Sequence, residues 1–217
     1  MKKILLLLLV VFLVCGCTPV KESSIEEILN TALNSKYKLY NKVNRGYKYY
    51  LPRGLKAVKL DEYNVIIKSK NYNYYLYVDL VSYYNKVDLN YQQDTKLYYS
   101  ELFDNGNDKF GIVDITEIND KEVIIEMSYH YADIAAKVKR EDINEAILNM
   151  IAVVNSVTYQ DDVIKSLLDE DVLSSTEEKI DVFKTEVNDT QTLDTVDDTY
   201  TGNEEEDYDP DVIDVID

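Results

Sequence analysis

Two neighbouring stretches decide the fold: Glu122-Val-Ile-Ile-Glu-Met-Ser-Tyr-His-Tyr131 and Asp142-Ile-Asn-Glu-Ala-Ile-Leu-Asn-Met-Ile-Ala-Val-Val-Asn-Ser-Val157. In the first, apolar and polar residues alternate except at Ile124, which is typical of a half-buried strand. We expect residues 132–138 to continue that strand. In the second, Asp142 can cap a helix that buries one apolar stripe. The stripe consists of Ile143, Ile147, Met150, Ile151, Val154 and Val157. The pair predicts a helix packed on a sheet.

Two further helices are expected on either side of these stretches. Near the start, Ser23 and Glu26 have the spacing of a capping box. The apolar residues of that helix fall on one face: Ile25, Ile28, Leu29 and Ala32. After the long helix, a second apolar group predicts one more short helix: Val163, Ile164, Leu167 and Leu168. Both helices are therefore expected to be amphipathic and to bury one side.

Residues 45–131 are predicted to form strands. Over residues 74–84, one face carries Leu76, Val78 and Leu80, and the other carries Tyr75, Tyr77, Asp79 and Tyr83. Asp104-Asn-Gly106 is a hairpin signal between a strand over 97–103 and another over 110–115. A helix, then strands, then helices predicts an α+β domain over residues 22–171, with helices packed on an antiparallel sheet.

The N-terminus resembles the signal peptide of a bacterial lipoprotein. Lys2 and Lys3 precede the apolar run Ile4–Val14, and Val14-Cys-Gly-Cys17 resembles a lipobox. The run is too short to span a bilayer, which takes about 20 residues. The resemblance implies a signal peptide over 1–16, lipid attachment at Cys17 and a tether over 17–21. The protein would then be anchored at the extracytoplasmic face of the cell membrane by its acyl chains.

Two other interpretations of the N-terminus stay open: an ordinary cleaved signal and an uncleaved anchor. Val14 also departs from the commonest lipobox, which has Leu at that position. If the lipoprotein interpretation holds, Cys15 is removed with the signal and Cys17 is acylated. These are the chain's 2 cysteines. The mature domain would then contain no disulfide, no cysteine nucleophile and no thiolate metal site.

Charge divides the chain into two unlike parts. Residues 1–159 hold 20 acidic and 20 basic residues, whereas residues 160–217 hold 21 acidic residues and 3 lysines. The folded part is thus near neutral, which argues against nucleic acid as a partner. The cluster Lys137-Val-Lys139-Arg140 is interpreted as the approach to a helix rather than a phosphate site. No phosphate-cradling glycine loop is present, and no cofactor is expected.

The C-terminal segment 172–217 is predicted to be a disordered acidic tail, because it has too little apolar content to offset its ordering entropy. The exception that its sequence allows is a short helix with Ile180, Val182 and Phe183, capped by the preceding Ser174-Ser-Thr-Glu-Glu178. Asp207, Asp209 and Asp211 suggest calcium. However, they lack the glycine turn and the distal glutamate of an EF-hand loop, so no metal ligand is predicted.

Candidate catalytic residues are sparse. His130 is the single histidine, and it is expected to be exposed on a strand beside Ser128 and Glu126. No Gly-x-Ser-x-Gly sequence accompanies it. Asp114 and Glu117 could in principle act as acid and base, although a pair at any given spacing means little among 41 acidic residues. No catalytic residue is therefore predicted.

Tyrosine is the unusual feature of the composition, since 15 of the 20 tyrosines lie between Tyr37 and Tyr99. One interpretation is an aromatic face that contacts a sugar or a protein. The other, which we favour, is that tyrosine packs the half-buried surfaces of strands.

The order of elements also resembles the PsbP-like fold over about residues 37–160. The residues that carry this resemblance are Tyr50-Leu-Pro-Arg-Gly54 and Asn155-Ser-Val-Thr-Tyr159. It implies a shape but transfers no binding residues, since that group shares no common active site.

The sequence therefore predicts a membrane-tethered envelope lipoprotein that is a non-enzymatic binding or accessory module. Its partners would be the membrane, through the lipid anchor, and an envelope protein or polymer that contacts the Tyr-rich sheet. The alternative is a small extracytoplasmic hydrolase that uses carboxylates. A flat aromatic sheet face would support the first hypothesis, and a concave pocket with convergent carboxylates would support the second.

Overall fold

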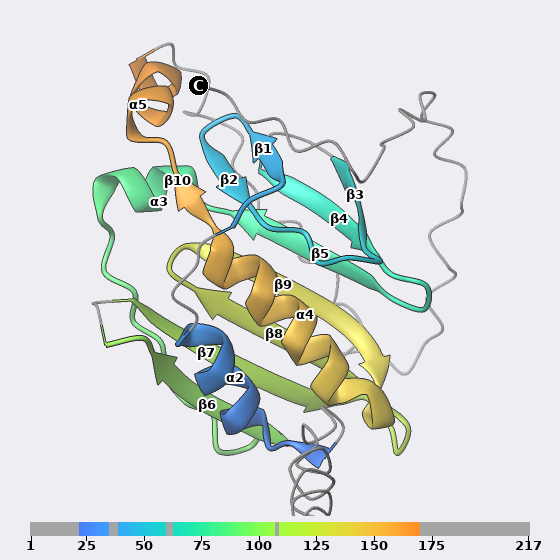
Figure 1. Cartoon of the computed structure of the whole chain (residues 1–217). Coiled ribbons are helices and arrows are strands. Elements are labelled where there is room, and N and C mark those ends of the chain that lie inside the picture. The colour runs from blue at the N-terminus through green and yellow to red at the C-terminus, as the bar shows by residue number, and fades with distance from the viewer. Residues whose placement is uncertain (1–21, 35–38, 60–62, 107–108, 170–217) are drawn as a thin grey trace, which may run out of the picture. The chain divides into compact units, whose positions relative to one another are not determined.

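The computed structural model describes residues 22–34, 39–59, 63–106 and 109–169 (Figure 1). The chain divides into two compact units, Met1–Phe183 and Lys184–Asp217, and every described residue belongs to the first. The predicted signal peptide, the tether and the acidic tail lie outside the described residues. In the described ranges, no helix has the length and apolar character needed to cross a membrane.

The helices and strands have the following bounds. The helices are α2 (Ile25–Leu33), α3 (Leu80–Asn85), α4 (Ile143–Ser156) and α5 (Asp161–Asp169), with a 3-10 turn η2 (Arg140–Asp142) before α4. The first strands are β1 (Lys42–Asn44), β2 (Tyr47–Tyr49), β3 (Lys56–Lys59), β4 (Asn64–Lys68) and β5 (Asn73–Val78). The later strands are β6 (Tyr99–Asp104), β7 (Phe110–Glu117), β8 (Glu122–Tyr129), β9 (Ala132–Lys139) and β10 (Thr158–Tyr159).

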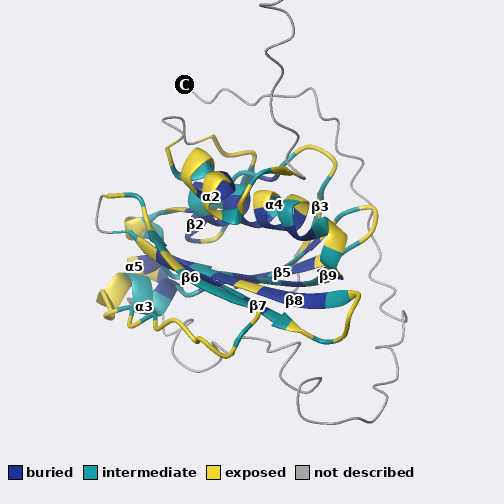
Figure 2. Ribbon diagram, turned by 90° about the horizontal axis from the view of Figure 1, so that it is seen from below, coloured by how far each residue is buried: buried dark blue, intermediate teal, exposed yellow. Residues whose placement is uncertain are grey.

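The main sheet has seven strands in the order β3-β4-β5-β9-β8-β7-β6, and every neighbouring pair is antiparallel. A smaller sheet has the order β1-β2-β10. Helices α2 and α4 lie on the same face of the main sheet, whereas α3 and α5 lie at one end of it (Figures 1 and 2). The predicted α+β class, with helices packed on an antiparallel sheet, is confirmed.

The core lies between α4 and the middle of the main sheet. Register places Ile67, Tyr74, Ala136, Ile125 and Ile115 in one row across five strands, and all five side chains are buried. All six apolar positions predicted for the long helix are buried as well. Burial of such side chains contributes roughly 1.5–3 kcal/mol each to folding, so this layer dominates the stability of the domain.

Helix α2 is fixed to α4 at both of its ends. Asn144 Nδ2 donates to the carbonyl of Ser23 over 2.7 Å, and Asn155 Nδ2 donates to the carbonyl of Ala32 over 3.0 Å. The capping box lies one residue later than predicted. Ser24 Oγ accepts from the Glu27 amide, and the Glu27 carboxylate accepts from the Ser24 amide, both over 3.1 Å. The predicted box at Ser23 and Glu26 is therefore wrong by one position.

The prediction of a single strand over residues 74–84 is wrong, because β5 ends at Val78. Asp79 stops the strand by capping α3: its carboxylate accepts from the Ser82 amide over 2.7 Å. A side chain that can satisfy an unpaired helix amide in this way favours helix initiation over strand extension. Asp79 and Tyr83 thus leave the face on which the sequence had placed them.

The predicted continuation of β8 through residues 132–138 is also wrong. His130 and Tyr131 both adopt left-handed backbone angles, with φ of 48° and 66°. Two such residues make the tight turn that matches the twist of a hairpin. The chain therefore reverses, and β9 pairs with β8 along its whole length. The hairpin predicted at Asp104-Asn-Gly106 is confirmed, and it joins β6 to β7.

Gly46 allows α3 and α5 to approach the small sheet. Its φ is +95°, and a Cβ there would lie 2.8 Å from Leu80 Cδ1 and 3.2 Å from Ile164 Cγ1. The Gly46 carbonyl also accepts from the Gln160 amide over 2.8 Å, just before α5 begins. Only a residue without a side chain fits this position.

The first prediction tests the packing of α4. Ile147→Asp should destabilise the domain by roughly 3–5 kcal/mol, because it places an unpaired charge in the buried layer. Ile147 is 0% exposed, whereas the adjacent Leu148 is 36% exposed. Leu148→Asp is therefore the matched control and should change stability little. Chemical denaturation of both variants measures the difference, and equal midpoints would contradict the assigned burial of this helix.

Candidate functional site

The face of the main sheet away from α2 and α4, called here the open face, is the first candidate site (Figure 2). Because side chains alternate along a strand, every second residue of the seven strands points to this face. By register, its central residues are Lys56, Val58, Ile66, Lys68, Tyr75, Tyr77, Asp133, Ala135, Lys137, Ile124, Glu126, Ile112, Asp114, Ser100 and Leu102. The face is therefore a mixture of aliphatic, aromatic and charged side chains.

Some of the tyrosines lie on this face and others in the core. Tyr75 and Tyr77 lie on the open face and are half-buried. Others fill the core, and five of them are buried: Tyr47, Tyr49, Tyr63, Tyr74 and Tyr129. Four of these five lie on strands, as the packing interpretation expects, but their side chains are buried rather than half-buried, and Tyr63 precedes β4. Ile124, which breaks the alternation predicted for its strand, lies on the open face and is 2% exposed.

Charges divide the open face into two halves. On β3 and β4, the exposed Lys56 lies directly opposite the exposed Lys68. On β7 and β8, Asp114 lies directly opposite Glu126. Like charges in opposite positions of an antiparallel pair are destabilising, so each half favours a neighbour of the other sign. We call β3, β4, β5 and β9 the lysine half, and β8, β7 and β6 the acidic half.

The crossover from α3 to β6, residues 86–98, is held against the sheet by three hydrogen bonds. Tyr131 Oη donates to the Val87 carbonyl over 2.8 Å. Ser100 accepts twice, at its carbonyl from Gln93 Nε2 and at its Oγ from the Asp94 amide, both over 3.0 Å. Burial and the nearby Asp133 carboxylate raise the pKa of Tyr91. The crossover is thus fixed near β6 and the β8–β9 turn.

An aromatic cluster surrounds that turn. The rings of Tyr83 and Tyr159 stack with centroids 3.6 Å apart, and His130 meets them edge-on at 5.9 Å and 5.8 Å. Tyr159 Oη donates to the His130 carbonyl over 2.7 Å. The prediction of an exposed strand histidine is therefore wrong, since His130 is a half-buried turn residue. Because His130 lies in the left-handed turn after β8, its side chain no longer follows the alternation of the strand.

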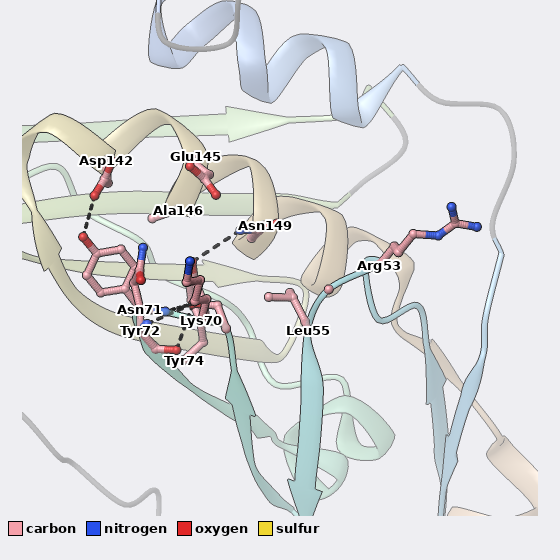
Figure 3. Close-up of a pocket in the computed structure, with 12 residues that line it drawn as sticks. Arg53, Leu55, Lys70, Asn71, Tyr72, Tyr74, Asp142, Glu145, Ala146 and Asn149 are labelled. Carbon is pink, nitrogen blue, oxygen red and sulfur yellow. Dashed lines mark hydrogen bonds between the residues drawn. The ribbon is translucent and has the colours of Figure 1, made fainter. Parts of the chain in front are cut away.

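The second candidate site is a pocket of about 190 Å³ between the start of α4, the β4–β5 hairpin and the turn before β3 (Figure 3). Its lining is mostly polar and comprises Arg53, Gly54, Leu55, Ser69, Lys70, Asn71, Tyr72, Tyr74, Asp142, Glu145, Ala146 and Asn149. Figure 3 shows the Arg53 side chain extending away from the others. Two carboxylates of one helix end, Asp142 and Glu145, therefore share the pocket with Lys70.

Hydrogen bonds tie the hairpin to α4 inside this pocket. Tyr72 Oη donates to Asp142 Oδ2 over 2.6 Å, and Asn149 Nδ2 donates to Tyr74 Oη over 3.4 Å. Burial, as the larger cause, and the hydrogen bond to Asp142 together raise the pKa of Tyr72 from 10.0 to about 12. Tyr72 thus stays a neutral donor at ordinary pH. Sequence alone could not bring together two residues that are 70 positions apart.

The carboxylate pair considered from the sequence does not form a site. Asp114 lies on the open face, whereas Glu117, three residues later on β7, points to the other side and pairs with Arg140. Among the described residues, no group of three or more His, Cys, Asp or Glu could hold a metal ion. Cys17, the predicted lipid attachment residue, lies outside the described residues.

Comparison with known proteins assigns no family. No family model matches the chain, and no curated protein matches it. Among solved structures, it is similar to a GTP binding regulator from Thermotoga maritima, with 9% sequence identity, covering 64% of this chain and 93% of that chain. The TM-score is 0.24, which is too low to carry any argument. The lipoprotein and PsbP-like resemblances therefore stay predictions.

The second prediction concerns the bond between Tyr72 and Asp142. Tyr72→Phe should lower the free energy of unfolding by about 1 kcal/mol at neutral pH, because a half-exposed hydrogen bond to a carboxylate is lost. Tyr84→Phe, at an exposed position of α3, serves as the control. An unchanged denaturation midpoint for Tyr72→Phe would show that the bond contributes nothing to the attachment of the hairpin.

The same variant should alter the alkaline limb of the stability curve. The pKa of Tyr72 is about 12 in the folded chain and 10.0 ordinarily. Below about pH 10 both states keep the proton, so stability is unaffected. Between these values the unfolded state loses its proton first, so stability falls as pH rises. Tyr72→Phe removes this titration, and its stability should therefore fall less steeply than that of the wild type over this window.

Proposed function

We propose that this protein is a membrane-tethered envelope lipoprotein, anchored at the extracytoplasmic face through Cys17, and that it is a non-enzymatic binding or accessory module. The N-terminal resemblance to a lipobox signal supports the anchor. The open face supports the binding role, with an envelope protein or polymer as its partner. Nucleic acid is not proposed, since the chain has a net charge of −18.

The observation that carries the binding role is the unequal covering of the two sheet faces. Helices α2 and α4 lie on one face, and no described helix lies on the other (Figure 2). On that open face Ile112 and Ile124 are buried, but the β3 and β4 end is exposed or half-buried. Val58 is 44% exposed, and Ile66 and Tyr75 are half-buried beside it. Aromatic and aliphatic side chains with charges around them are typical of protein interfaces. The lysine half of the open face is therefore the proposed contact surface.

The hydrolase alternative rests on the pocket at the start of α4. Asp142 and Glu145 would be its acid and base, since they are the carboxylates that the fold places together there. However, Asp142 already accepts the hydrogen bond of Tyr72, which ties the hairpin to the helix. The position of Asp142 is therefore explained by its structural role in holding the hairpin, and no substrate is needed to account for it. The binding role is therefore the proposal.

The third prediction concerns the anchor. Metabolic labelling with a fatty acid should label the wild-type chain, whereas Cys17→Ala should abolish the label and release the protein from the membrane fraction, because the acyl chains supply the membrane affinity. Cys15→Ala is the matched control and should keep the label, since Cys15 would leave with the signal peptide. Label that persists on Cys17→Ala would contradict the proposed anchor.

The fourth prediction concerns the binding surface. A photo-crosslinking amino acid at Val58, on the open face, should give covalent adducts heavier than the chain itself in intact cells. The same amino acid at Leu148, on α4, should give far fewer. The two positions are 44% and 36% exposed, so exposure alone does not separate them. Equal yields from both positions would argue against the open face as the contact surface.

A further inference from the structure

The lysine half of the open face favours an acidic and apolar occupant. Its two outer strands place Lys56 opposite Lys68, both exposed. On β9 the same face carries Lys137 and, four residues earlier at the other end of the strand, Asp133. Positive charge therefore gathers at the end that holds Lys56, Lys68 and Lys137. The adjacent row along the same face is apolar: Val58, Ile66, Tyr75 and Ala135. A carboxylate between the two opposed lysines would relieve their repulsion. An apolar side chain beside it would cover the row.

The chain that follows α5 has this composition. Residues 172–183 are Val-Leu-Ser-Ser-Thr-Glu-Glu-Lys-Ile-Asp-Val-Phe. They contain five large apolar residues, which are Val172, Leu173, Ile180, Val182 and Phe183, and three carboxylates, which are Glu177, Glu178 and Asp181.

The segment is long enough to reach the lysine half. Helix α5 packs near the end of β5, because Gly46 approaches both Leu80, at the start of α3, and Ile164 of α5. From that end to Lys68 is the length of one strand, about 20 Å for the six residues of β5. Ile180 lies eleven residues after Asp169 in the sequence, and a chain of that length can span about 36 Å when extended. Attachment to the domain also gives the segment a high effective concentration there.

We propose that residues 172–183 dock on the lysine half of the open face, with Ile180, Val182 and Phe183 over the apolar row and Asp181 near Lys56 and Lys68. This narrows the proposed disordered tail to residues 184–217. The acidic half repels the same segment through Asp114 and Glu126, which restricts the segment to one side of the face. A second copy of the chain fits less well, because each copy has a net charge of −18.

Docking of this segment would make it an internal competitor for the external partner. The competition with an external partner therefore rests on the proposed binding function. The docking of residues 172–183 on the lysine half does not, because it involves one chain alone. The segment would protect the lysine half until a partner with more favourable contacts displaced it. The partner would then need the same chemistry, with carboxylates flanked by aliphatic or aromatic side chains.

The test uses the full chain with p-benzoylphenylalanine at Phe183, which replaces one aromatic residue with another. Irradiation of the purified protein should give cross-links within one chain, mapped by mass spectrometry to residues 56–75 or 133–139. The control carries the same amino acid at Tyr200, in the remainder of the tail, and should give few. Adding Lys56→Glu and Lys68→Glu should lower the Phe183 yield about fivefold. Lys121→Glu, at an exposed site between β7 and β8, should not.

Three results would overturn the proposal. Cross-links between two chains, with a yield that rises with protein concentration, would assign the lysine half to a second copy. Cross-links to α2 or α4, or none above the Tyr200 level, would show that the segment does not dock there. An unchanged yield after both lysine substitutions would exclude the charge pairing. By contrast, a lack of heavier adducts at Val58 in cells would contradict only the proposed binding function.

Discussion

The rest of the structure depends on the burial of α4 against the middle strands of the main sheet. Ile147, Met150 and Ile151 are fully buried there, and they meet the rows that β5, β9 and β8 present on one face. The helix also carries the asparagines that hold α2, and its first turn receives the hydrogen bond from the β4–β5 hairpin. One helix thus positions a second helix, a hairpin and the small sheet, because each of them contacts it directly.

A fold element could be predicted from the sequence when the pattern that specifies it lies within one short segment. The stripe of α4 was predictable at every position, since it depends on a period of 3.6 residues within one segment. The hairpin at residues 104–106 was predictable because its signal, an Asn-Gly turn, is also contained in one short segment. The end of β5 was not, because Asp79 continues the alternation of the strand while its carboxylate caps the next helix. The reversal at His130 and Tyr131 was missed because neither residue is a usual turn former.

The candidate site was less accessible to sequence reasoning than the fold. Tyr75 and Tyr77 were placed on the correct face from alternation alone. The opposition of Lys56 to Lys68, and of Asp114 to Glu126, depends on the register between strands. Register is set by the whole sheet and cannot be obtained from one strand. The pocket joins Tyr72 to Asp142 across 70 positions, so its composition emerges only from the tertiary fold.

The two asparagine contacts of α2 have a mechanical consequence. If Cys17 carries the proposed lipid anchor, a pull on it would act on the described chain from the residues just before α2, where Ser23 contacts Asn144. That load would act on the interface between α2 and α4 rather than on the strand ladders. Peeling α2 away would break its two amide contacts and uncover Ile28 and Leu29 before any strand pair separated. The domain is therefore expected to yield under tension by losing this helix first, while the sheet and its open face stay intact.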